Sequence, residues 1–378
     1  MKKNFLYIIL LLSQGVTAQM IQGKLINAKT HLPVSQITVF TEDASVFVTS
    51  NQKGEVLLDA GQVLNKTLYI DDYEYEFSEK VISGTANFEW MLTPNSETLE
   101  EIVIYKRPLK DLLMEIVDHS IASFSKNTKV EAFYRENYLK NDRVETYAEG
   151  IMDFYIGKKL KDVSTVVNHS RVVDVHSNPQ DTLDMMLTLV VSPSELIESS
   201  MRFKFIKNLI NSKDYDFMVK SKMVGDRKLF TCYIQSKPDI KKRFLYKGYF
   251  VYDEEKKLIL ETNFGFEEEK KMYNSKVNIL IAKFDFLDMK YKTKYLDAEK
   301  FYYPTYARVD YDVIVNSKLG KVKDQRLNTY SYFYTLQFKE TETLPSENQW
   351  YRKKDLYSNG NKFTEEFWKD ASIQNLSE

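Results

Sequence analysis

Histidine is the first residue type to examine for chemistry, because imidazole binds metal ions and exchanges protons near neutral pH. The chain has four histidines, at His31, His119, His169 and His176. His169 and His176 lie seven residues apart in one strand-like run. An odd separation directs two strand side chains to opposite faces, which is the wrong geometry for a shared metal ion. We therefore predict no metal site and no cofactor.

Cys232 is the only cysteine, so the chain forms no internal disulfide bond. It follows Phe230 and precedes Ile234 at spacings of two, which places the thiol on the same side of a strand as two apolar side chains. Buried thiols in apolar surroundings are inert. We interpret Cys232 as a packing residue.

Acidic residues are numerous, but they alternate with lysines in the runs Asp253 to Lys257 and Glu267 to Lys271, as in solvated turns. The sequence contains no glycine-rich phosphate loop, no G-x-S-x-G elbow and no H-E-x-x-H motif. We therefore predict a protein that is not an enzyme. A hydrolase is the less favoured alternative, and it would need two acids or a Cys–His pair to meet in a cleft.

Aromatic residues make up 14% of the chain, with 26 Tyr and 23 Phe, and many gather near the C-terminal end. Cross-strand packing on a wide sheet is the simpler interpretation and carries more weight. The functional alternative is a concave apolar surface for a lipid, glycan or peptide. The candidate ligand-facing side chains are Tyr303, Tyr306, Tyr311, Tyr330, Tyr332 and Tyr334.

Beyond Asn127 the pattern is one strand after another, with apolar residues at alternate positions. We predict that residues 128–378 form a large curved antiparallel sheet, resembling a half-barrel. The segment Asp181 to Ile210 lacks this alternating pattern. Within it, Ser192, Pro193 and Glu195 are typical of the start of a helix. This helical insertion is expected to cover one side of the sheet. The predicted strands are 144–157, Val163 to Val175, Lys228 to Gln235, Phe244 to Tyr252, Lys257 to Phe266, Val277 to Tyr291, Tyr303 to Val315 and Asn328 to Phe338.

The stretch Leu99 to Phe124 joins this sheet to a smaller N-terminal module. Apolar residues recur at spacings of three and four after Pro108, from Leu109 to Phe124, which predicts an amphipathic helix that packs on a sheet. Residues 96–127 are therefore read as a linker and helix. Residues 19–95 alternate in short runs separated by turns, which predicts a small β-sandwich. Its expected core residues are Ile37, Val39, Val46, Val48, Leu57, Leu68, Ile70 and Phe88.

Gly23, Leu25, Thr30, Pro33 and Val39, with the turn and strand from Asn51 to Leu58, resemble the carboxypeptidase-regulatory-like domain. The resemblance implies a seven-stranded transthyretin-like sandwich, found in exported proteins of Bacteroidetes-type bacteria and without catalytic groups. The chain departs from the family pattern at Asn27, Val34 and Val56. The following module resembles an uncharacterised C-terminal region of such proteins, and more distantly the half-barrel of LolA-type lipoprotein carriers.

The N-terminus reads as a signal peptide over residues 1–18, with Lys2 and Lys3 before an apolar run and small residues at the expected cleavage site. No later stretch has the roughly 20 apolar residues of a membrane-spanning helix. Loss of the two lysines would change the formal net charge from −1 to −3, which argues against nucleic acid as a partner. We predict an exported protein, periplasmic or associated with the outer membrane.

Two functions follow from these features. The leading hypothesis is a non-enzymatic envelope protein that binds or carries an apolar or amphipathic ligand. It predicts an apolar cavity inside the curved sheet. The alternative is a scaffold or adaptor that binds envelope proteins, by strand addition at an open sheet edge.

Overall fold

The structure is a computed structural model of a mainly β protein. It describes residues 19–42, 45–95, 101–159, 163–175, 189–224, 227–242, 244–273, 276–278, 282–298, 301–317, 323–341, 343–359 and 365–369. The predicted signal peptide, His176 and the first part of the predicted insertion lie outside the described residues.

The N-terminal module is a sandwich of two small sheets, and both pack on one apolar core. In the first sheet β1 (Met20–Asn27) is antiparallel to β4 (Glu55–Asp59) and parallel to β7 (Phe88–Leu92). The second sheet has the order β3-β2-β5-β6, built from Phe47–Thr49, Thr38–Thr41, Thr67–Ile70 and Ser78–Val81. One helical turn, α2 (Ala60–Val63), follows β4. The seven strands match the number expected, while the family resemblance stays a prediction.

Most of the expected core residues of the sandwich are buried, but Leu57 is a correction. Val56 and Leu58 are 2% and 1% exposed and face the core, whereas Leu57 is only half-buried. Successive strand residues face opposite sides, so the expected register in β4 was wrong by one residue. Phe88 packs against the core from its margin and is half-buried.

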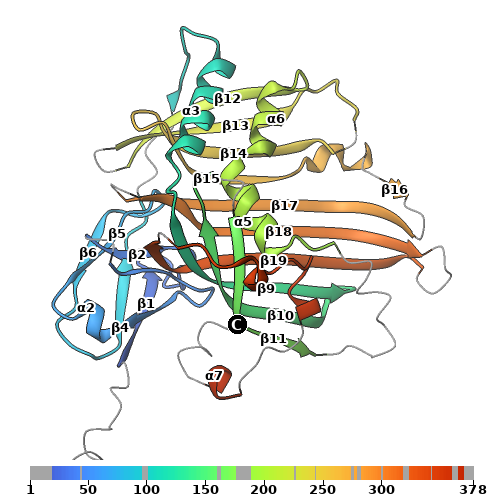
Figure 1. The fold of residues 1–378 in the computed structure, drawn as a ribbon. Helices are drawn as coiled ribbons and strands as arrows, with labels where there is room; N and C mark the ends of the chain where they lie inside the picture. Colours follow the sequence, from blue (N-terminus) through green and yellow to red (C-terminus); the bar gives the residue numbers. More distant parts are fainter. Residues whose placement is uncertain are drawn as a thin grey trace, which may run out of the picture.

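The second module is an open 12-stranded antiparallel sheet, as the sequence predicted (Figure 1). Its order is β11-β10-β9-β19-β18-β17-β15-β14-β13-β12-β8, and the short β16 (Lys276–Asn278) pairs with β17. The first five strands are β8 (Glu101–Ile102), β9 (Thr128–Lys140), β10 (Arg143–Ile156), β11 (Val163–Asp174) and β12 (Tyr215–Val224). The others are β13 (Arg227–Ser236), β14 (Tyr246–Asp253), β15 (Leu258–Phe266), β17 (Ala282–Ala298), β18 (Phe301–Ser317) and β19 (Gln325–Glu340).

Three helices cover one face of this sheet: α3 (Leu109–Ser123), α5 (Pro193–Arg202) and α6 (Lys204–Asn211) (Figure 1). The predicted amphipathic helix is confirmed as α3, and its apolar stripe is buried. Ser192 caps α5 by accepting a hydrogen bond from the Glu195 backbone N–H at 3.2 Å, with Pro193 in the first turn, as predicted. Phe203 in the left-handed region, at φ 46°, separates α5 from α6. Shorter elements are η2 (Glu268–Tyr273), η3 (Glu347–Gln349), η4 (Tyr357–Asn359) and α7 (Glu365–Lys369).

Each predicted strand of the large sheet is present, but three details differ. The run Val277 to Tyr291 is divided between β16 and β17. Strands β8, β9 and β12 were not among the predicted strands, and β8 lies in the stretch predicted as a linker and helix. In β9 charged residues interrupt the apolar alternation and are nevertheless buried: Arg135 is 7% exposed and pairs with Glu149 of the neighbouring β10 at 3.3 Å.

Candidate functional site

The six tyrosines expected to face a ligand are divided between the two faces of the sheet. Tyr311 lies on the face that α3, α5 and α6 cover, whereas Tyr303 packs on Phe47 of the sandwich, with ring centroids 5.1 Å apart. The other four lie on the opposite face, which we call the outer face: Tyr306, Tyr330, Tyr332 and Tyr334. A bulge at Thr305 interrupts the alternation of β18, and beyond it Tyr306 turns to the outer face and Tyr311 to the helices.

Four of these tyrosines are buried packing residues, which agrees with the interpretation as cross-strand packing rather than with the ligand-facing alternative. Tyr303, Tyr306, Tyr332 and Tyr334 are at most 3% exposed. Tyr303 stacks on Phe338 with ring centroids 4.2 Å apart, beneath the sandwich. Along β19 the rings of Tyr330, Tyr332 and Tyr334 stack at centroid distances of 6.4 Å, and only Tyr330 is half-exposed.

A hollow of about 730 Å³ opens on the sheet beside Tyr330. Asp310, which pairs with Tyr330 across the β18–β19 ladder, is part of its wall. A volume of this size lies in the range of ligand-binding sites. The lining residues come from β16 to β19, with Leu287 at a bulge of β17: Lys276, Asp285, Phe286, Leu287, Asp288, Lys290, Asp310, Asp312, Arg326 and Asn328.

Arginines hold the carboxylates of the hollow in fixed orientations. Arg308 donates from Nε and Nη2 to Asp310 at 2.7 to 3.1 Å, and its guanidinium lies 4.3 Å from the Tyr330 ring centre. Arg326 donates to both oxygens of Asp312 at 2.8 and 2.6 Å. Bidentate pairs of this kind fix geometry as well as adding attraction. The carboxylates therefore present their remaining lone pairs in set directions.

This donor set has the hydrogen-bonding groups to bind a polar ligand. Asp288, Asp310 and Asp312 each have a cationic side chain within 3.6 Å. No serine, cysteine, histidine or tyrosine is among the described residues that line the hollow.

The face covered by helices is closely packed in the part of the chain that the structure describes. Helix and sheet side chains form one apolar cluster there, and most of its members are at most a few per cent exposed. The apolar cavity expected inside the curved sheet is thus filled by the helical insertion and α3 at these residues. Side chains from both layers include Leu113, Ile116, Ile197, Ile206, Phe154, Phe250, Phe264 and Phe333.

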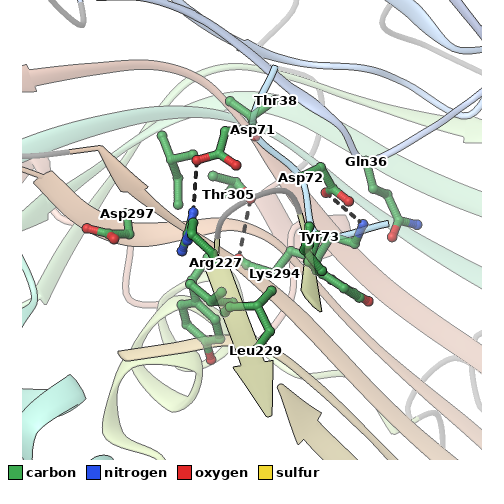
Figure 2. Close-up of a pocket in the computed structure, with 14 residues that line it drawn as sticks. Gln36, Thr38, Asp71, Asp72, Tyr73, Arg227, Leu229, Lys294, Asp297 and Thr305 are labelled. Atoms are coloured by element: carbon green, nitrogen blue, oxygen red, sulfur yellow. Dashed lines mark hydrogen bonds and ion pairs between the residues drawn. The ribbon is translucent and has the colours of Figure 1, made fainter. Parts of the chain in front are cut away.

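A second hollow lies between the sandwich and the large sheet, and it is much smaller, at about 50 Å³ (Figure 2). Asp71 of the loop after β5 binds Arg227 of β13 at 2.9 Å, and Asp72 binds Lys294 of β17 at 3.3 Å. The space admits one or two water molecules rather than a ligand. We interpret it as part of the contact between the modules.

Lys294 is the centre of that contact, with a side chain only 5% exposed. Its ammonium group lies 3.0 Å from Glu74, 3.3 Å from Asp72 and 3.9 Å from Glu261. Burial lowers the pKa of Lys294, but the three carboxylates outweigh it and raise the pKa above the ordinary value. Burial raises the pKa of Asp72, whereas Lys294 overcomes burial at Glu74 and lowers the pKa of that carboxyl.

Glu136 of β9 is another fully buried carboxyl, on the helix-covered face. It accepts hydrogen bonds from the hydroxyls of Tyr134 and Tyr138 at 3.0 and 2.8 Å. The backbone N–H groups of Leu356 and Tyr357 add two more, at 3.0 and 2.6 Å. Burial raises the pKa of Glu136 to about 7, and these hydrogen bonds oppose the rise. Glu136 therefore anchors the C-terminal segment to the sheet.

The three histidines that the structure describes, and Cys232, occupy positions typical of turn, surface or packing residues. His31 occupies a turn at φ 57°, and His119 is exposed on α3. His169 stacks on Phe367 of α7 with ring centroids 3.7 Å apart, and burial lowers its pKa. Cys232 is 0% exposed, and burial raises the pKa of its thiol. Within the described ranges, no group of three or more potential ligands is placed to hold a metal ion.

The chain was compared with known families, curated proteins and solved structures. No family model matches it, and no curated protein matches it. Similar solved structures include lipovitellin, in a study of lipid–protein interactions, at 7% identity and a TM-score of 0.26, covering 59% of this chain and 26% of the lipovitellin chain. A LolA superfamily protein from Nitrosomonas europaea has 9% identity and a TM-score of 0.26, covering 64% of this chain and 97% of its own.

These two similarities are too low to carry an argument about function. The LolA protein belongs to the class that the half-barrel resemblance suggested, but its TM-score is only 0.26. The chain spans about a quarter of the lipovitellin chain. Among the described residues no helix is both long and apolar enough to span a membrane.

Proposed function

We propose that this protein is a non-enzymatic binding protein of the cell envelope that takes a hydroxyl-rich ligand, such as a glycan chain, in the hollow over β16 to β19. The observation that supports this proposal is a hollow of about 730 Å³ whose wall carries carboxylates, an amide and a guanidinium, with Arg308 orienting Asp310 and Arg326 orienting Asp312. Such planar groups donate to and accept from sugar hydroxyls. Phe286 and Leu287 contribute apolar surface beside them.

A glycan fits better than a lipid, because the apolar face of the sheet is already occupied. Lipid chains need an apolar cavity, and the described apolar face packs against α3, α5 and α6 instead. The polar hollow lies outside that core. The location in the envelope rests on the signal-like N-terminus of the sequence.

Affinity electrophoresis through gels that contain soluble polysaccharides, neutral and acidic, tests the proposal. We expect one class of polysaccharide to retard the protein. The variants Asp310→Asn and Asn328→Ala should weaken that retardation by about tenfold, equivalent to about 1.4 kcal/mol. Asp118→Asn, at an exposed carboxyl on α3, is the matched control. Retardation that is unchanged in both hollow variants, or absent for every polysaccharide, would overturn the proposal.

Mass spectrometry of small molecules that copurify with the protein from its native envelope distinguishes the ligand classes. A hexose-containing species supports the glycan. A copurifying acyl lipid that remains bound to Asp310→Asn and Asn328→Ala would contradict it, because such a lipid would have to bind elsewhere.

A further inference from the structure

The strand β8 forms one open edge of the 12-stranded sheet, and its outward edge is unpaired among the described strands. It pairs with β12 through Ile102 opposite Lys220 and Glu101 opposite Ser221. The ladder continues for one more residue, because the Val103 N–H donates to the Val219 carbonyl at 2.9 Å. This edge is independent of the hollow.

The backbone of Ile102 and Ile104 is directed away from the sheet. In an antiparallel ladder, alternate residues of an edge strand direct their N–H and C=O groups inward and outward. Since Val103 bonds inward to β12, its two neighbours present their backbone groups to the open side. These groups form a template for one further strand.

The side chains at the same positions are apolar and exposed. Ile102 and Ile104 are 66% and 91% exposed, among the most exposed large apolar residues that the structure describes. The register places Met218 of β12 opposite Ile104, and it is 43% exposed. Soluble proteins usually protect an edge of this kind with lysine, proline or a bulge. Here two β-branched residues stand on it, which suits cross-strand packing with an added strand.

We infer that β8 is a docking edge for an extended segment of a partner protein, with β-branched residues at alternate positions and acidic residues at its ends. Lys106 is exposed just after the edge and Lys220 lies opposite Ile102; these two lysines outnumber the exposed Glu101 at the start of the edge, so the surroundings favour an acidic segment. The exposed apolar area of three side chains is well below the about 800 Å² per partner that a stable globular interface needs. A linear strand, which gains affinity from backbone hydrogen bonds, fits this edge better than a second folded copy.

Fluorescence anisotropy with the full chain and a labelled synthetic peptide tests the inference. The peptide alternates valine and threonine and carries glutamates at both ends. We expect saturable binding below about 1 mM, weakened about tenfold or more by Ile102→Lys with Ile104→Lys. A peptide N-methylated on the amides that face the edge should lose binding, and a lysine-ended peptide should bind more weakly. Leu32→Lys, at an exposed residue of the sandwich, is the matched control.

Hydrogen exchange locates the contact, since the backbone amides of Ile102 and Ile104 should become protected when the peptide binds. Equal binding of the N-methylated peptide, or protection elsewhere only, would overturn the inference. A third outcome would also overturn the inference: the chain does not bind the peptide but associates with itself, and Ile104→Lys abolishes that association. The edge would then be a contact with a second copy of the chain. Both isoleucines are exposed, so their replacement should leave the fold intact, and thermal unfolding checks this.

Discussion

Lys294 of β17 and Glu74 of the sandwich lie 220 residues apart in the sequence, and their charged groups meet at 3.0 Å. Lys294 is surrounded on its other sides by Asp72 and the buried Glu261. Glu261 also accepts hydrogen bonds from the hydroxyls of Tyr73 and Tyr249 at 2.6 and 2.8 Å, and Lys292 lies 3.9 Å from it. A buried ionic cluster thus fixes the sandwich against the sheet at this point.

The variant Lys294→Met should destabilise the protein by about 3 to 5 kcal/mol, because it leaves Asp72 buried without its cation and removes one of the two ammonium groups beside the buried Glu261. Urea unfolding measures the change. Lys53→Met, at an exposed lysine of the sandwich, is the control and should stay within about 0.5 kcal/mol of the parent. A loss below about 1 kcal/mol in Lys294→Met would show that the cluster contributes little to stability.

The titration of Glu136 should lower the free energy of unfolding as the pH rises from about 4.5 to about 7. Its pKa is 4.5 as an ordinary glutamate and about 7 in the fold, so over this interval the folded state holds a proton that the unfolded state has released. At about 1.4 kcal/mol per pKa unit, the loss is roughly 3 kcal/mol.

Urea unfolding at several pH values, compared between the parent and Glu136→Gln, isolates this contribution. The variant carries no titratable group there, so the stability difference between the two proteins should change across the interval. Glu89→Gln, at an exposed carboxyl of β7, should leave the pH dependence as it is in the parent. Identical pH dependence in the parent and Glu136→Gln would refute the assignment.

The sequence predicted the large antiparallel sheet, α3 and the start of α5 because these depend on local patterns. Alternation of side chains gives strands, and Ser192 with Pro193 gives a helix start. The same alternation separates Tyr306 from Tyr311, since five positions along a strand reverse the face. Treating the six tyrosines as one group leaves this alternation of side chains out of account.

Other parts of the site had no local signal. Arg326 and Asp312 lie on neighbouring strands, and their pairing depends on the β18–β19 register, which the sequence does not state. The long-range contact of Lys294 with Glu74 is of the same kind. The filled helix-covered face also depends on where α5 and α6 dock, and their apolar stripes alone do not identify the surface that receives them.

Tyr302 and Tyr303 are adjacent, both buried, and should respond in opposite ways to loss of the hydroxyl group. The Tyr302 hydroxyl donates to the Ile259 carbonyl at 2.6 Å, whereas the Tyr303 hydroxyl is buried with no hydrogen-bond partner among the described residues. Tyr302→Phe should therefore destabilise by about 1 to 2 kcal/mol, and Tyr303→Phe should be neutral or stabilise by about 1 kcal/mol. Calorimetric unfolding of both variants checks the signs, and equal losses would contradict this account.

The thiol of Cys232 should be unreactive in the folded protein. Its side chain is 0% exposed, and burial raises the pKa, so both access and the thiolate form are suppressed. An aromatic disulfide reagent should label the native protein negligibly and label one thiol per chain in urea. Leu32→Cys in a Cys232→Ala background supplies an exposed thiol and should react at once. Rapid labelling of native Cys232 at a similar rate would mean that β13 is accessible in the folded state, and the interpretation of Cys232 as an inert packing residue would then be wrong.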